Sequence, residues 1–140
     1  MYVLDTNVVS ELMRPEPAQA VEAWVAGQPA GNLFFSAVGE AELRYGVAIM
    51  PEGRRRNQVG AEVEAVLSED FEGRVLPFES RAARFYAVIA AECRAAGRPA
   101  AQADCQIAAI ARARGMAVAT RNVRHFEHMG IDVTDPWEDE

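Results

Sequence analysis

Three acidic residues of this 140-residue chain, Asp5, Glu42 and Asp104, stand at strand ends or on helix faces where apolar side chains are expected. Asp5 directly follows residues 2–4, an apolar run that is too short for a helix and predicts a buried strand. Glu42 and Asp104 each interrupt the apolar face of a predicted helix. If folding gathers these carboxylates, they repel one another and lose hydration, and a divalent cation removes that cost. Their oxygen ligands suit Mg²⁺ or Mn²⁺.

The two helical acids are identified by the spacing of their neighbours. Glu42 belongs to a stripe that we expect to face the core, made up of Val38, Glu42, Tyr45 and Ile49. Asp104 begins a similar inner stripe, made up of Asp104, Ile107, Ala108 and Ala111. Glu40, by contrast, precedes Arg44 by four residues and is expected to pair with it on the solvent side.

Each acid also has a purely structural explanation. Asp5 could cap the helix that follows it, where Thr6 and Asn7 are further capping candidates, and a helix dipole could stabilise Asp104. A shared site is favoured because strand ends and helix starts of an α/β fold converge on one edge of the sheet. A further polar cluster, residues 120–122, is expected at the same edge as Asp5.

Short apolar runs alternate with amphipathic segments along the chain. We predict strands at residues 2–4, 32–35, 74–78, 116–119 and 131–134, and helical segments carrying residues 8–13, 21–25, 37–50, 59–67, 82–93 and 101–114. Strands that alternate with helices imply crossover connections and a mainly parallel sheet covered on both faces. The sequence therefore predicts one domain over residues 1–140 with a three-layer α/β architecture.

The charge balance excludes one class of function. The formal net charge of −7, from 14 basic and 21 acidic residues, argues against a protein that coats nucleic acid by charge alone. Arginines nevertheless cluster at residues 54–56 and 112–124, where they form either a basic rim or simply solvated helix faces.

Compartment and membrane association are also addressed by the sequence. A signal peptide is not recognised, because Asp5 interrupts the first apolar run, and no apolar stretch approaches membrane-spanning length. We therefore expect a cytoplasmic protein without membrane association. Cys93 and Cys105 lack zinc-ligand spacing and are expected to be reduced and packed.

Four segments, in this order, resemble the PIN-domain family of ribonucleases. They are LDTN at residues 4–7, AEL at 41–43, AAQAD at 100–104 and ATRN at 119–122, the last followed by Phe126. The chain is most similar to the FitB-like and VapC-like toxins of toxin–antitoxin pairs, including RVLPF at 74–78 and PW at 136–137. The resemblance implies about five parallel strands, an acidic pocket holding Mg²⁺ or Mn²⁺, and endonucleolytic cleavage of RNA.

The resemblance also assigns roles by position. Asp5, Glu42 and Asp104 match the acidic metal-site residues, and these three with Asn122 are the candidate catalytic residues. The candidate substrate-binding residues fall into two groups. Thr6 and Thr120 match positions beside the acids. The arginines could hold flanking phosphates, and they are Arg121, Arg124 and the cluster Arg54, Arg55 and Arg56. The resemblance further implies a homodimer and a small, DNA-binding antitoxin that blocks the pocket.

The chain departs from the fullest family pattern at the fourth acid. Many relatives carry Asp at the position of Asn122 or of His125, and this chain has an acid at neither. Since an amide oxygen can still orient a water molecule, we expect activity to survive with altered metal affinity and preference. His125 could serve the site, but a single histidine beside a phenylalanine in a connecting segment is more often a surface residue, and His128 is interpreted in the same way.

Two other functions are compatible with this sequence. A PIN-like binding module without catalysis could regulate transcription together with its DNA-binding partner, and metal-dependent RNA cleavage would distinguish the two. A phosphatase could use Asp5 as its nucleophile, although Asn7 stands where the common phosphotransferases of that kind have a second aspartate. A dinucleotide-binding fold is disfavoured because no glycine-rich loop follows the first strand.

Overall fold

A computed structural model of the chain describes residues 1–138 and is built around a five-stranded sheet. The strands are β1 (Tyr2–Leu4), β2 (Leu33–Ser36), β3 (Val75–Leu76), β4 (Ala117–Ala119) and β5 (Val133–Thr134). Their order is β3-β2-β1-β4-β5, and every pairing is parallel. Because Leu4 pairs with Ala119, Asp5 and Thr120 leave neighbouring strands side by side at the carboxyl edge.

The helices connect these strands as crossovers. They are α1 (Thr6–Leu12), α2 (Gln19–Ala26), α3 (Ala37–Ala48), α4 (Arg54–Ala65), α5 (Ser80–Ala95), α6 (Gln102–Ala113) and α7 (Val123–Phe126), with a 3₁₀ turn at Ala30–Asn32 and a wider π-type turn at Val66–Asp70. Gly97 and Gly115, just beyond α5 and α6, have φ of +68° and +66°, as expected of glycines that end helices. Among the helices of residues 1–138, none is long and apolar enough to cross a bilayer.

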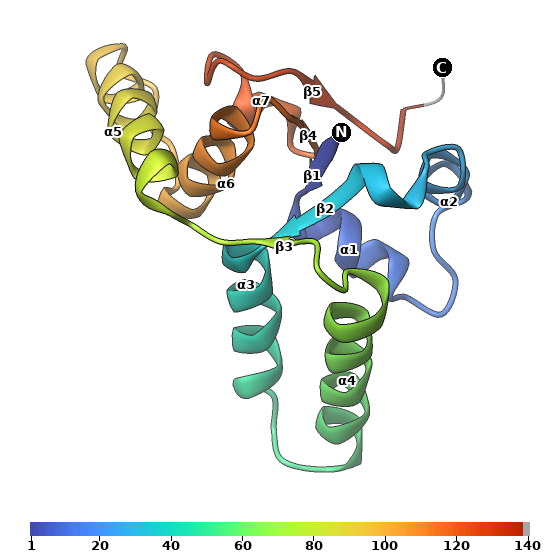
Figure 1. Cartoon of the computed structure of the whole chain (residues 1–140). Helices are drawn as coiled ribbons and strands as arrows, with labels where there is room; N and C mark the ends of the chain where they lie inside the picture. Colours follow the sequence, from blue (N-terminus) through green and yellow to red (C-terminus); the bar gives the residue numbers. More distant parts are fainter. Residues whose placement is uncertain (139–140) are drawn as a thin grey trace.

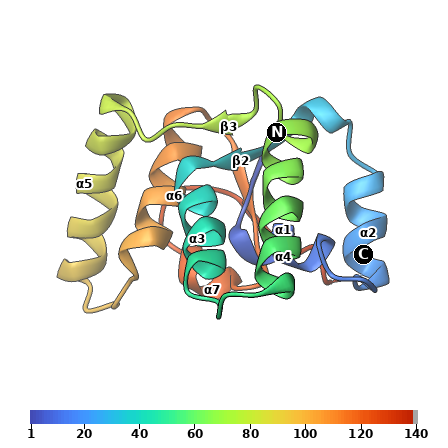
Figure 2. The ribbon, with the colours of Figure 1, turned by 90° about the horizontal axis from the view of Figure 1, so that it is seen from below.

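The helices cover both faces of the sheet, which confirms the predicted three-layer α/β architecture. Figures 1 and 2 show α5 and α6 side by side on one face, with α1, α2 and α4 on the other. Helix α3 continues from β2 and projects beyond the sheet beside α4 (Figure 1). The predicted third strand, residues 74–78, is reduced to two residues in the structure.

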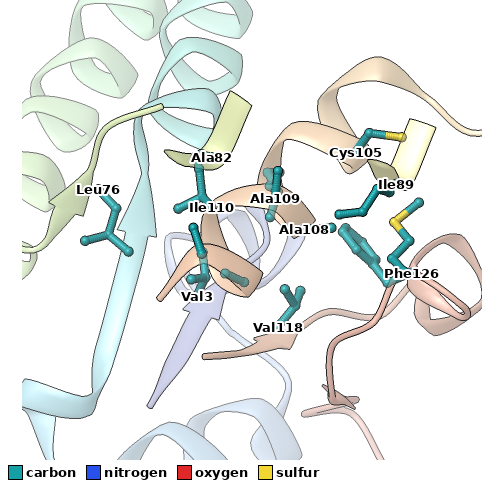
Figure 3. Packing of buried hydrophobic residues seen from close by; sticks show 14 of the residues in the cluster. Val3, Leu76, Ala82, Ile89, Cys105, Ala108, Ala109, Ile110, Val118 and Phe126 are labelled. Atoms are coloured by element: carbon teal, nitrogen blue, oxygen red, sulfur yellow. The ribbon is translucent and has the colours of Figure 1, made fainter. Parts of the chain in front are cut away.

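Each face has its own hydrophobic core. On the α5–α6 face, Val3 and Val118 of the sheet pack against Ile89, Ile110 and Phe126, all at most 1% exposed (Figure 3). On the other face, the core residues of β1, β2 and β4 pack against those of α1, α2 and α4, and Leu4, Val8, Val21, Phe35 and Val63 are among them. Burial on both faces explains why the strands are continuous apolar runs.

The predicted inner stripe of α3 is wrong except for Val38, which packs against the core of the α5–α6 face. Tyr45 and Ile49 are 67% and 64% exposed, whereas Leu43 and Val47 are the residues of α3 that pack against the second core. Helix α3 contacts α1, α4, α6 and the sheet, but it extends past the sheet and leaves the side that carries Tyr45 exposed.

Candidate active site

Asp5 lies at the carboxyl end of the central strand and is only 6% exposed. Its Oδ1 accepts a hydrogen bond from the Thr6 N–H at 2.8 Å, so Asp5, rather than Thr6 or Asn7, is the N-cap of α1. Burial raises the pKa of Asp5 above its ordinary value, and the hydrogen bonds from Thr120 and Thr6 oppose that rise. The cap explanation is therefore correct, but it accounts for only one of the two carboxylate oxygens.

Thr120 holds the other oxygen of Asp5. Its fully buried hydroxyl donates to Asp5 Oδ2 at 2.7 Å and accepts from Asn7 Nδ2 at 3.3 Å and from the Asn122 N–H at 3.0 Å. A hydroxyl has one proton and two lone pairs, so all its hydrogen-bonding capacity is used. The network ties the segment after β4 to α1 and fixes the orientation of the Asp5 carboxylate.

Glu42 reaches the same edge from α3. It receives a hydrogen bond of 2.5 Å from the Thr6 hydroxyl to its Oε1, which places it beside the residue that follows Asp5. Glu42 is exposed, in contrast to the buried position predicted from its apolar neighbours. Its neighbour Glu40 pairs with Arg44 at 2.7 Å, as the spacing predicted.

Asp104 lies in the first turn of α6, and its side chain is 19% exposed. Burial raises its pKa, and the negative charges of Asp5 and Glu42 raise it further. The carboxylate of Asp104 is thus within electrostatic reach of the other two acids. Three acids separated by up to 99 positions in the sequence therefore converge on the carboxyl edge of the sheet.

His125 is exposed, as the sequence predicted, but it also lies beside one of the three acids. Its Nδ1 lies 3.3 Å from Asp104 Oδ2, and its side chain is 58% exposed. It belongs to α7, a helix of four residues that was not predicted because so short a segment shows no periodicity. The fully buried Phe126 anchors this helix in the core, and the residue before it, His125, lies beside Asp104.

The remaining candidate residues surround this centre. Asn122 is exposed at the start of α7, held by its backbone N–H. Arg121 lies over the ring of Trp137 at 5.0 Å, and Arg124 is exposed without an ion pair to any of residues 1–138. The cluster of Arg54, Arg55 and Arg56 begins α4, and Arg55 shares with Thr6 and Glu42 the lining of a groove of about 580 Å³.

The donor set suits a hard divalent cation. Asp5 and Asp104 both offer carboxylate oxygens. Desolvation raises the pKa of both, and repulsion from the other acids adds to the rise at Asp104, so a cation would relieve both costs. Within residues 1–138, no three acidic, histidine or cysteine side chains already surround a single point. These residues therefore fit a cation that keeps several water ligands and takes only a few protein ligands, as Mg²⁺ does.

Comparison with known proteins gives a consistent result. The chain matches the PIN domain over residues 2–131. It is 46% identical to VapC ribonuclease Y4jK of Sinorhizobium fredii (strain NBRC 101917 / NGR234) over 99% of both chains. It is 38% identical to Toxin FitB of Neisseria gonorrhoeae (strain ATCC 700825 / FA 1090) over 99% of this chain and 100% of that chain. The crystal structure of FitAcB from Neisseria gonorrhoeae superposes with a TM-score of 0.91 at 37% identity, covering 99% of this chain and 100% of that chain. Other similar solved structures are VapBC and FitAB toxin–antitoxin complexes, some of them bound to DNA.

Proposed function

Because this chain belongs to the PIN-domain family, with relatives that are named ribonucleases and toxins, we propose that it is a Mg²⁺- or Mn²⁺-dependent endoribonuclease and the toxin of a toxin–antitoxin pair. The observation that carries the proposal is the convergence of Asp5, Glu42 and Asp104 from β1, α3 and α6 at one edge of the sheet. The reaction is the hydrolysis of a phosphodiester bond in RNA.

Asp5 and Asp104 are the residues that would hold the cation, with Glu42 acting directly or through water. The cation, when bound, would neutralise charge on the scissile phosphate and make a water molecule more acidic. Thr120 and Thr6 orient the carboxylates of Asp5 and Glu42 through their hydroxyls. The protein thereby prepares the acceptor oxygens before substrate arrives, which limits the reorganisation needed during the reaction.

Arginines on two sides of the acids would hold the RNA. Arg124 and Arg121 follow β4, and Arg55 lines the same groove as Thr6 and Glu42. Contacts of this kind neutralise phosphates and set the register of the strand without reading its sequence. They would offset the repulsion between RNA and a chain of net charge −7.

The test is RNA cleavage by the purified, antitoxin-free protein. With Mn²⁺ or Mg²⁺ we expect cleavage that EDTA abolishes, and we expect Asp5→Asn and Asp104→Asn to lose at least about 100-fold in rate, since each removes a charged ligand of the cation. Arg94→Ala, which changes an exposed arginine near the end of α5, is the matched surface control and should cleave as the parent does.

Two results would contradict the nuclease proposal. Equal cleavage by the parent and both aspartate variants would indicate a contaminating enzyme. Absence of cleavage under every metal condition, with the protein folded and free of antitoxin, would favour a non-catalytic PIN-like module that acts with a DNA-binding partner.

The proposal includes partners and location. A small DNA-binding antitoxin is supported by the similar solved VapBC and FitAB complexes, and its gene is expected beside this one. A homodimer would have twice the 15.3 kDa mass of one chain, and light scattering can measure it. The exposed apolar residues Tyr45 and Ile49 provide surface for such contacts. The site of action would be the cytoplasm, where RNA is abundant.

A further inference from the structure

His125 contacts a carboxylate of the proposed metal site, although the chain has no acid at the fourth position of the family pattern. The imidazole Nδ1 lies 3.3 Å from Asp104 Oδ2. Two ligands bound side by side to one octahedral ion, each at a bond length of about 2.1 Å, lie roughly 3 Å apart. The spacing of the two atoms is thus close to that of neighbouring ligands of one cation.

The surroundings of the two side chains support the same arrangement. His125 and Asp104 line one pocket of about 170 Å³, together with Arg124. The imidazole and the carboxylate therefore reach a common space that has room for an ion and its water molecules.

We propose that His125 is a nitrogen ligand of the cation held by Asp104, and that it shifts the preference of the site from Mg²⁺ toward Mn²⁺ and later transition metals. This inference rests on the proposed function, because it assumes a cation at the acidic site. Imidazole nitrogen is a softer ligand than carboxylate oxygen, and Mg²⁺ takes oxygen ligands almost exclusively. Replacing an acid by histidine at this edge would therefore lower affinity for Mg²⁺ relative to Mn²⁺.

Electron spin-echo measurements on bound Mn²⁺ can detect a directly coordinated nitrogen without any assay of activity. The chain contains two histidines, His125 and His128, so imidazole nitrogen can come only from these. We expect nitrogen modulation in the parent at pH 8, its loss in His125→Ala, and its retention in His128→Ala. Both side chains are exposed, so neither substitution removes core packing.

Calorimetric titration with each metal supplies a second measurement. We expect His125→Ala to bind Mn²⁺ at least about 10-fold more weakly than the parent, while its affinity for Mg²⁺ changes much less. His125→Asp should bind Mg²⁺ more tightly than the parent, because it returns an oxygen ligand to this position. Circular dichroism checks that each variant is folded.

The possible results separate this inference from the proposed function. Mn²⁺ that binds to the parent without nitrogen modulation overturns His125 as a ligand and leaves the nuclease proposal intact. An equal loss of Mn²⁺ and Mg²⁺ affinity in His125→Ala, without nitrogen modulation in the parent, assigns His125 to orienting Asp104 and likewise overturns the inference. A parent that binds neither metal overturns both.

Discussion

The carboxylate of Asp5 is held by two hydrogen bonds of different origin, one from the backbone of Thr6 and one from the hydroxyl of Thr120. These bonds stabilise the charged form but do not fully offset the loss of hydration, since burial still raises the pKa of Asp5. In the absence of metal, ionised Asp5 therefore costs stability, and a bound cation would recover it. Buried acids with raised pKa values are typical of functional sites.

This cost gives a pH-dependent prediction for Asp5→Asn in EDTA. Because the folded-state pKa of Asp5 is raised, protonated Asp5 stabilises the fold relative to ionised Asp5. This contribution to the free energy of unfolding is present in full below the ordinary pKa of 3.8 and is lost as pH rises through the folded-state pKa. The variant carries no such ionisation. Its Tm relative to the parent should therefore increase between pH 3 and pH 7.

Differential scanning calorimetry at the two pH values measures this change. Thr120 loses its acceptor in the variant at either pH, so that cost does not alter the comparison. A Tm difference that is the same at pH 3 and pH 7 would show that Asp5 ionises in the folded protein as it does in the unfolded chain.

At the scale of the elements, the start of α3 determines where Glu42 lies. The buried Ser36 caps the helix by accepting the Gly39 N–H at 2.9 Å, and Gly39 lies directly against the ring of Phe35. A Cβ on Gly39 would approach the Phe35 ring to 2.4 Å, and Phe35 is fully buried. Glycine is thus required here for close packing of helix on strand.

Two glycines of α3 provide a matched pair of substitutions. Gly39→Ala should lower the free energy of unfolding by about 1–3 kcal/mol, because the buried ring must move. Gly46→Ala, where a Cβ would meet no atom within 4 Å, should raise it by up to about 1 kcal/mol through helix propensity. Urea denaturation measures both, and equal effects of the two substitutions would contradict the packing account of α3.

The elements also show which features can be predicted from sequence. The strands and long helices follow from apolar runs, periodicity and helix-ending glycines such as Gly97 and Gly115. The face of α3 was mispredicted because Tyr45 and Ile49 are apolar yet exposed, and surface of that kind mimics a core stripe. Helix α7, and with it the position of His125 beside Asp104, depends on the burial of Phe126, a tertiary contact that no local pattern reveals.

For the whole molecule, the sheet order brings the site together. Strand β1 lies between β2 and β4, so the segments that follow these strands emerge as neighbours, and α6 adds Asp104 from the α5–α6 layer. The convergence of Asp5 and Thr120 could be predicted from parallel strands alone. The approach of Glu42 could not, since it depends on how α3 projects beyond the sheet (Figure 1).

Anomalous diffraction from crystals of the antitoxin-free protein grown with Mn²⁺ would locate the cation. We expect one Mn²⁺ peak bonded to carboxylate oxygens of Asp5 and Asp104, with Glu42 bonded directly or through a water molecule, and no peak at that position in Asp104→Asn crystals. Mn²⁺ bound elsewhere on the protein, with the three acids left without a cation, would contradict a metal-dependent nuclease site at this edge of the sheet.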